Sequence, residues 1–133
     1  MIETKRTPLT EILAVAAVVE VGTGFALIIA PGVVVALLLG AEVSGVGTAL
    51  GRCFGIALVA LGVACSPRGQ TTDRASAIVR AMLIYNLSIA IYLAYLGAVG
   101  PLGGVLLWPA VALHAVVALL LIRTWRAEQP TRT

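Results

Sequence analysis

The segment LTEILAVAAVVEVGTGFALIIAPG, residues 9–32, contains a long apolar run that Pro31 and Gly32 bring to an end. An α-helix needs about 20 mostly apolar residues to cross about 30 Å of hydrocarbon. The run has this length, and it is too long for the apolar part of a cleaved signal peptide. We therefore predict a first membrane span over about residues 9–30, with Glu20 inside it.

The rest of the chain repeats this pattern. Of its 133 residues, 60% are hydrophobic and 11% are charged, whereas a soluble domain carries about 25% charged residues. A soluble fold with so few charges could not cover its surface, so the composition indicates a membrane protein. We predict an all-α fold, a four-helix bundle that forms one transmembrane domain over residues 1–133. The predicted spans cover about residues 9–30, 46–65, 75–99 and 103–122.

One apolar stretch, residues 31–39, is too short to cross a bilayer. It begins with a proline, and Gly40 follows it. We predict that it forms a short helix. This helix either lies at the membrane interface or continues the first span after a kink.

The basic residues indicate the orientation, because cytoplasmic segments of membrane proteins carry an excess of Lys and Arg. With four spans, the N-terminus, the loop 66–74 and the C-terminus lie on one side. The opposite connections, 31–45 and 99–102, carry no basic residue. Those on the first side or at its interface are Lys5, Arg6, Arg68, Arg74, Arg80, Arg123, Arg126 and Arg132. We therefore predict that both termini are cytoplasmic, and this scattered charge argues against nucleic-acid binding.

A series of small residues opens the second predicted span. Gly47, Gly51 and Gly55 form a GxxxGxxxG pattern, and Gly62 extends it. Small residues four apart make a groove in which another helix backbone can approach closely. This groove is predicted to pack against another helix of the same chain, or alternatively against a second copy or a subunit of a membrane complex.

Well inside each predicted span lies one charged, imidazole or amide side chain: Glu20, Arg52, Asn86 and His114. At 1.5 Å per residue, the first, third and fourth lie roughly 15 Å deep, near the middle of the membrane. Arg52 lies roughly 9 Å below the external end of its span. A charge at the bilayer centre costs about 2.5–3.5 kcal/mol on insertion scales. We therefore predict an intramembrane Glu20–Arg52 pair, supported by His114 and Asn86.

The third span carries a further polar face. Tyr85, Ser88, Tyr92 and Tyr95 are spaced three, four and three residues apart, and this spacing places them on one side of a helix. Tyrosine is common at membrane interfaces, but Tyr85 lies near mid-depth. The candidate ligand-binding residues are therefore Glu20, Arg52, Tyr85, Asn86, Tyr92 and His114. The candidate catalytic residues are His114 and Glu20.

Several functions agree with this constellation. It could hold the head of a lipophilic small molecule of the lipid or quinone class, or act as a small membrane enzyme with His114 as general acid or base. It could also serve only as hydrogen-bonding contact between helices in an accessory subunit, or carry protons or ions in an oligomer. The sequence identifies no cofactor. A single histidine excludes bis-histidine haem ligation within one chain, and His114 with Glu20 falls short of the usual three metal ligands.

The segment Leu38-Leu39-Gly40, followed by an arginine and a run of aliphatic residues and glycines from Arg52 to Gly62, resembles part of a known group. Over the first half of the chain, the plan is similar to that of small bacterial four-helix membrane proteins, the DoxX-like and DUF4345-like proteins. The resemblance implies a multi-pass protein of the bacterial inner membrane. Some DoxX-type proteins are associated with quinone-linked sulfur oxidation, so it also implies a lipophilic redox partner. It assigns no role to any single residue.

Overall fold

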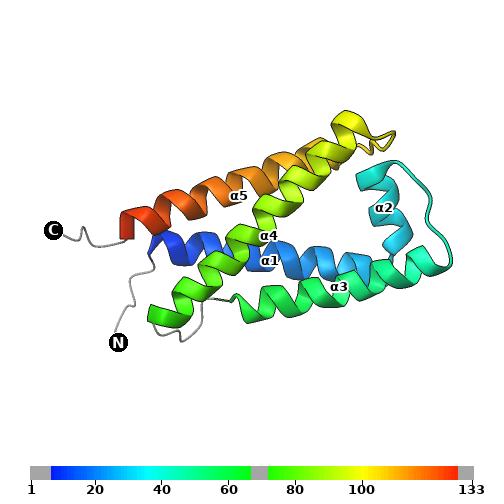
Figure 1. Cartoon of the computed structure of the whole chain (residues 1–133). Helices are drawn as coiled ribbons and strands as arrows, with labels where there is room; N and C mark the ends of the chain where they lie inside the picture. The colour runs from blue at the N-terminus through cyan, green and yellow to red at the C-terminus, as the bar shows by residue number, and fades with distance from the viewer. Residues whose placement is uncertain (1–6, 67–71, 129–133) are drawn as a thin grey trace.

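The computed structural model describes residues 7–66 and 72–128, and within these ranges the chain is all-α (Figure 1). Its helices are α1 (Pro8–Ile29), α2 (Pro31–Leu39), α3 (Val46–Ala64), α4 (Thr72–Val99) and α5 (Leu107–Glu128). Four of them, all except α2, are long and apolar enough to cross a membrane. The predicted arrangement of four apolar spans with one short helix after the first is therefore confirmed.

Local sequence explains where α1 and α2 meet. The side chain of Thr7 caps the start of α1 by accepting a hydrogen bond from the Thr10 backbone N–H. Proline has no N–H to continue a helix, but it suits the first turn of a new one. Accordingly, α1 ends at Ile29 and α2 begins at Pro31. The end of α2 is marked by Gly40, whose φ of +69° is a left-handed conformation that glycine adopts without strain.

The long helices associate in two pairs, α1 with α3 and α4 with α5 (Figure 1). Small residues bring α1 and α3 into backbone contact. A Cβ atom on Gly55 would lie 2.6 Å from the carbonyl oxygen of Gly24, and one on Gly62 would lie 2.7 Å from that of Ala17. Two glycines of the predicted series therefore pack within the chain, as the first alternative proposed. Nearer the start of α3, a Cβ on Gly51 would lie 3.1 Å from the Pro31 side chain.

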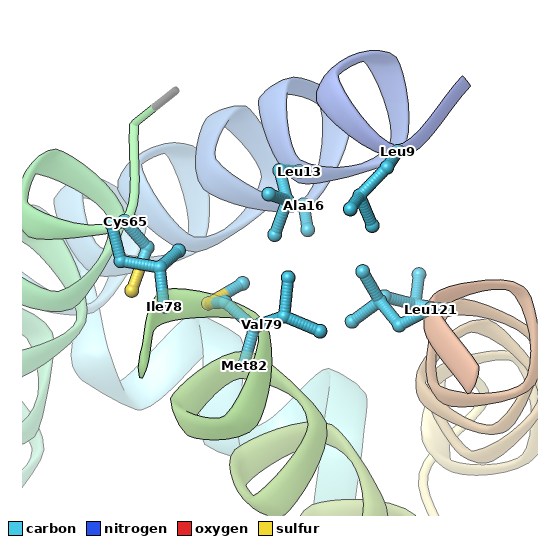
Figure 2. Close-up of a cluster of buried hydrophobic side chains, with 9 residues drawn as sticks. Leu9, Leu13, Ala16, Cys65, Ile78, Val79, Met82 and Leu121 are labelled. Carbon is cyan, nitrogen blue, oxygen red and sulfur yellow. The ribbon is translucent and has the colours of Figure 1, made fainter. Parts of the chain in front are cut away.

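One apolar core joins the two pairs at the end of the molecule where α1 begins and α5 ends, which we call the base (Figure 2). It contains side chains from all four long helices or their ends: Leu9, Leu13, Ala16, Cys65, Ile78, Val79, Met82, Val117 and Leu121. Cys65 is thus a buried small apolar residue, whereas Cys53 is exposed. The base thus holds the α1–α3 pair and the α4–α5 pair together at this end of the molecule.

A second connection lies at the opposite end, which we call the α2 end (Figure 1). The turn between α4 and α5 donates three backbone hydrogen bonds to the last carbonyls of α2: Gly103 N to Leu39 O at 2.9 Å, Gly104 N to Leu38 O at 3.2 Å, and Leu106 N to Leu37 O at 2.9 Å. A helix cannot satisfy its own last carbonyls, so this turn supplies the missing donors.

This turn changes the fourth predicted span, which was expected to cover about residues 103–122. Helix α5 instead begins at Leu107 and ends at Glu128. Residues 103–106 stay outside the helix, and the N–H groups of Gly103, Gly104 and Leu106 bond to α2 rather than to a preceding helical turn. Apolarity alone could not distinguish a helical glycine from one that caps a neighbouring helix.

Candidate functional site

Asn86 and His114 form the centre of a polar cluster between α4 and α5. His114 Nδ1 lies 2.8 Å from Asn86 Oδ1, and Asn86 Nδ2 donates to the Met82 carbonyl at 2.8 Å. The amide nitrogen needs an acceptor and finds one at Met82, so the amide oxygen faces the histidine. An amide oxygen can only accept, and we therefore assign the proton to Nδ1 of His114. This tautomer leaves Nε2 as a hydrogen-bond acceptor.

Tyr85 extends the cluster to the other helix pair. Its ring packs edge-on against the His114 imidazole, with the centroids 5.8 Å apart and the planes at 80°. Its hydroxyl lies within side-chain hydrogen-bonding reach of the Glu20 carboxyl group. Glu20 is only 2% exposed and Asn86 only 1%. The polar cluster, defined as Glu20, Tyr85, Asn86 and His114, thus connects α1 with α4 and α5.

The cluster lies in the middle of the membrane-spanning helices. Counted from the α2 end at 1.5 Å per residue, Glu20 is roughly 14 Å below the last residue of α1, and Asn86 roughly 20 Å below that of α4. His114 is roughly 10 Å below the first residue of α5. Hydrocarbon about 30 Å thick therefore leaves these groups with little access to bulk water.

The structure corrects the predicted partner of Glu20. Arg52 is exposed, and its Nε donates to the carbonyl of Ile28 at 3.3 Å. Ile28 lies eight residues beyond Glu20 on α1, roughly 12 Å away along the axis. The predicted Glu20–Arg52 pair is wrong. Because α1 stops before Pro31, its last carbonyls need outside donors, and a cation is also favoured at a helix C-terminus.

The other candidate ligand-binding residues divide between the cluster and the surface. Tyr85, Asn86, His114 and Glu20 meet, whereas Tyr92 is 58% exposed and lies outside the cluster. The contact between Tyr85 and Glu20 was not predicted from the sequence. The available signal was position, since Tyr85 directly precedes Asn86 and shares its depth.

The hydrogen-bonding capacity of the cluster is only partly used. Among the side chains of residues 7–66 and 76–127, no fully buried nitrogen or oxygen lacks a partner. His114 is half-buried, and its hydrogen bond to the described part of the chain uses Nδ1. Its Nε2 is therefore unpaired there but still accessible. No group of three or more His, Cys, Asp or Glu side chains that could hold a metal ion occurs in the same ranges.

Chemically, the cluster combines a neutral acceptor with a carboxyl group and a phenol. Nε2 of His114 can accept a proton or a hydrogen bond, and Tyr85 contacts that ring with its own ring and interacts with Glu20. Such a set can bind a hydroxyl group, and it also contains a group suited to general base chemistry.

Comparison with known proteins adds no relative: no family model, no curated protein and no solved structure matches this chain. No match therefore supports the DoxX-like resemblance. What is shown is a small multi-pass membrane protein with an intramembrane polar contact between His114 and Asn86.

Proposed function

We propose that this chain binds the uncharged, hydroxyl-bearing head of a lipophilic molecule, of the lipid or quinol class, at the polar cluster. The observation that carries the proposal is the acceptor at His114 Nε2, which is accessible but unpaired in the described chain. A polar group in an apolar surrounding is costly unless it is hydrogen-bonded. A ligand hydroxyl would supply the donor that His114 lacks.

The depth of the cluster narrows the class of ligand. A charged group at the bilayer centre costs about 2.5–3.5 kcal/mol or more, and the phosphate of a phospholipid stays at the interface. The head of the proposed ligand must therefore be neutral and small enough to lie near mid-membrane. A quinol and a hydroxyl lipid without phosphate meet this condition, and a quinol offers two hydroxyls to the cluster.

The orientation of the protein in the membrane also forms part of the proposal. The asymmetry of basic residues supports cytoplasmic termini, so the α2 end would face outward in a bacterial inner membrane. A reporter fused after Thr133 should then be cytoplasmic, and one inserted near Glu42 should be external. The reverse result would move the access side of the ligand to the cytoplasmic leaflet.

The binding test compares variants of adjacent residues on α5. Wild-type protein in lipid nanodiscs would be incubated with decylubiquinol, with its di-O-methyl ether and with dioleoylglycerol, and retained ligand would be measured by native mass spectrometry. His114→Ala should weaken binding about five-fold, since one neutral hydrogen bond is worth about 1 kcal/mol. Leu113→Ala, on the exposed side of α5, is the matched control.

The outcomes separate the possible roles of the cluster. Retention of the quinol but not the ether or the diacylglycerol would identify a quinol site, and retention of the diacylglycerol would identify a lipid site. Equal binding by wild type and His114→Ala would refute the proposal. So would a wild type that retains neither hydroxyl compound, with His114→Ala losing only thermal stability, because the cluster would then serve only to hold helices together.

A further inference from the structure

A ladder of hydroxyl groups runs along α4 from the polar cluster towards the α2 end. It consists of Tyr85, Ser88, Tyr92 and Tyr95, which share one helix face. Only its first member, Tyr85, belongs to the cluster. Ser88 is exposed, as are Tyr92 at 58% and Tyr95 at 57%. From Tyr85 to Tyr95 the ladder covers ten residues, roughly 15 Å.

The ladder lies beside the packed face of α4 and not on it. Over residues 76–99 of this helix, the buried residues are Ile78, Val79, Met82, Asn86, Ala90 and Leu93. Beyond Tyr85 the hydroxyl-bearing residues are each offset by one or two positions from this set, and none of the described helices covers them. Contact between helices therefore accounts for Tyr85 but not for Ser88 and Tyr92.

Position at the membrane interface does not account for the ladder either. Tyr95 is four residues from the end of α4, roughly 6 Å deep, where tyrosine is ordinary. Ser88 is eleven residues from that end, roughly 16 Å deep. None of the hydroxyls of Ser88, Tyr92 and Tyr95 is hydrogen-bonded within residues 7–66 and 72–128. Unpaired hydroxyls in hydrocarbon are costly. These hydroxyls therefore suit a surface that forms hydrogen bonds with the polar group of a ligand.

We propose that this ladder is the access path along which the oxygen-bearing head of the lipophile travels between the interface at the α2 end and the polar cluster. The inference rests on the proposed function and names the class of head that can use the path, one with hydroxyl groups at both ends of its ring. Hydroxyl groups donate and accept. Each hydroxyl group of the ladder can therefore form a hydrogen bond with the head of the ligand as the head loses its hydrogen bond to the preceding hydroxyl group.

The test separates the rate of exchange from the strength of binding. The variant Ser88→Ala/Tyr92→Phe removes two hydroxyls and retains the ring and nearly all of the volume. Thr124→Val is the control, since its hydroxyl bonds to the Leu120 carbonyl of its own helix at 2.7 Å, near the base. Nanodisc samples loaded with deuterated decylubiquinol would be chased with the unlabelled quinol, and native mass spectrometry would follow the exchange.

The double variant should exchange its quinol at least about five-fold more slowly, the factor that corresponds to losing one hydrogen bond along the path. Its occupancy at equilibrium should stay within about two-fold of wild type, because the site at His114 is unchanged. The Thr124→Val control should match wild type in both quantities. If the double variant were unstable, Tyr92→Phe alone should still slow exchange.

Unchanged exchange in the double variant, with quinol still bound by wild type, would overturn the access path and leave the proposed function intact. Absence of quinol binding in wild type would overturn the path, and the proposed function would fall with it only if dioleoylglycerol were not retained either. A third outcome is dimerisation through this face, with Tyr92→Cys forming an intermolecular disulfide in nanodiscs and the double variant becoming monomeric. That result would also overturn the path, because a second copy would cover the hydroxyls.

Discussion

Replacing Gly104 by alanine should separate the two helix pairs at the α2 end. A Cβ atom there would lie 2.6 Å from the carbonyl carbon of Leu37 and 2.7 Å from that of Leu38, and it would overlap the Leu37 oxygen. All three atoms belong to the backbone of a helix and cannot turn aside. The turn must therefore withdraw from α2, and the hydrogen bonds from Gly103, Gly104 and Leu106 should be lost together.

The size of the effect follows from those bonds. Each is worth about 0.5–1.5 kcal/mol net, so losing three should cost about 3 kcal/mol. Alanine restricts the unfolded chain and recovers about 0.4–1 kcal/mol. Since Gly104 does not have a positive φ, no backbone strain is added. We expect Gly104→Ala to reduce the free energy of unfolding by about 2–3 kcal/mol.

The neighbouring glycine provides the control. A Cβ atom on Gly103 would meet nothing within 4 Å, so Gly103→Ala should lie within about 1 kcal/mol of wild type. Unfolding in mixed micelles titrated with sodium dodecyl sulfate, followed by far-UV circular dichroism, would compare the three proteins. If Gly104→Ala were as stable as Gly103→Ala, the turn would not cap α2 and the reasoning would be refuted.

Three further predictions concern contacts inside the membrane. Gly55→Ala should force α1 and α3 apart and lower the free energy of unfolding by about 1–3 kcal/mol in the same assay, whereas Gly22→Ala should not, because a Cβ there meets nothing within 4 Å. Equal stabilities of the two variants would show that the backbones of α1 and α3 do not touch. Asn86→Leu should cost about 1–3 kcal/mol by leaving the His114 N–H unpaired, and adding His114→Leu should recover part of that loss; strictly additive losses would count against the hydrogen bond. Arg52→Gln should cost about 1 kcal/mol through the lost bond to Ile28, and it should combine additively with Glu20→Gln in a double-mutant cycle; a strong coupling would restore the ion pair rejected above.

Much of the architecture was determined by the sequence alone. Crossing hydrocarbon requires about 20 apolar residues in a helix, so the spans could be predicted from composition and length. Pro31 separated α1 from α2 because proline lacks the N–H that a continuing helix needs. Close packing of Gly55 against another helix also followed from local chemistry, since only small residues let two backbones meet, whereas the choice of α1 as the partner came from the fold.

The partners of the polar residues were decided only by tertiary structure. Counting residues gives the depth of a side chain, but not the rotation of its helix or the neighbour that it faces. Depth and charge together favoured Arg52 as the partner of Glu20. The pairing of α1 with α3 instead brings Arg52 to the carbonyl of Ile28, and the crossing of α4 brings the Tyr85 hydroxyl to Glu20. The start of α5 was decided in the same way, because the N–H groups of Gly103, Gly104 and Leu106 bond to the end of α2 and the helix begins only at Leu107.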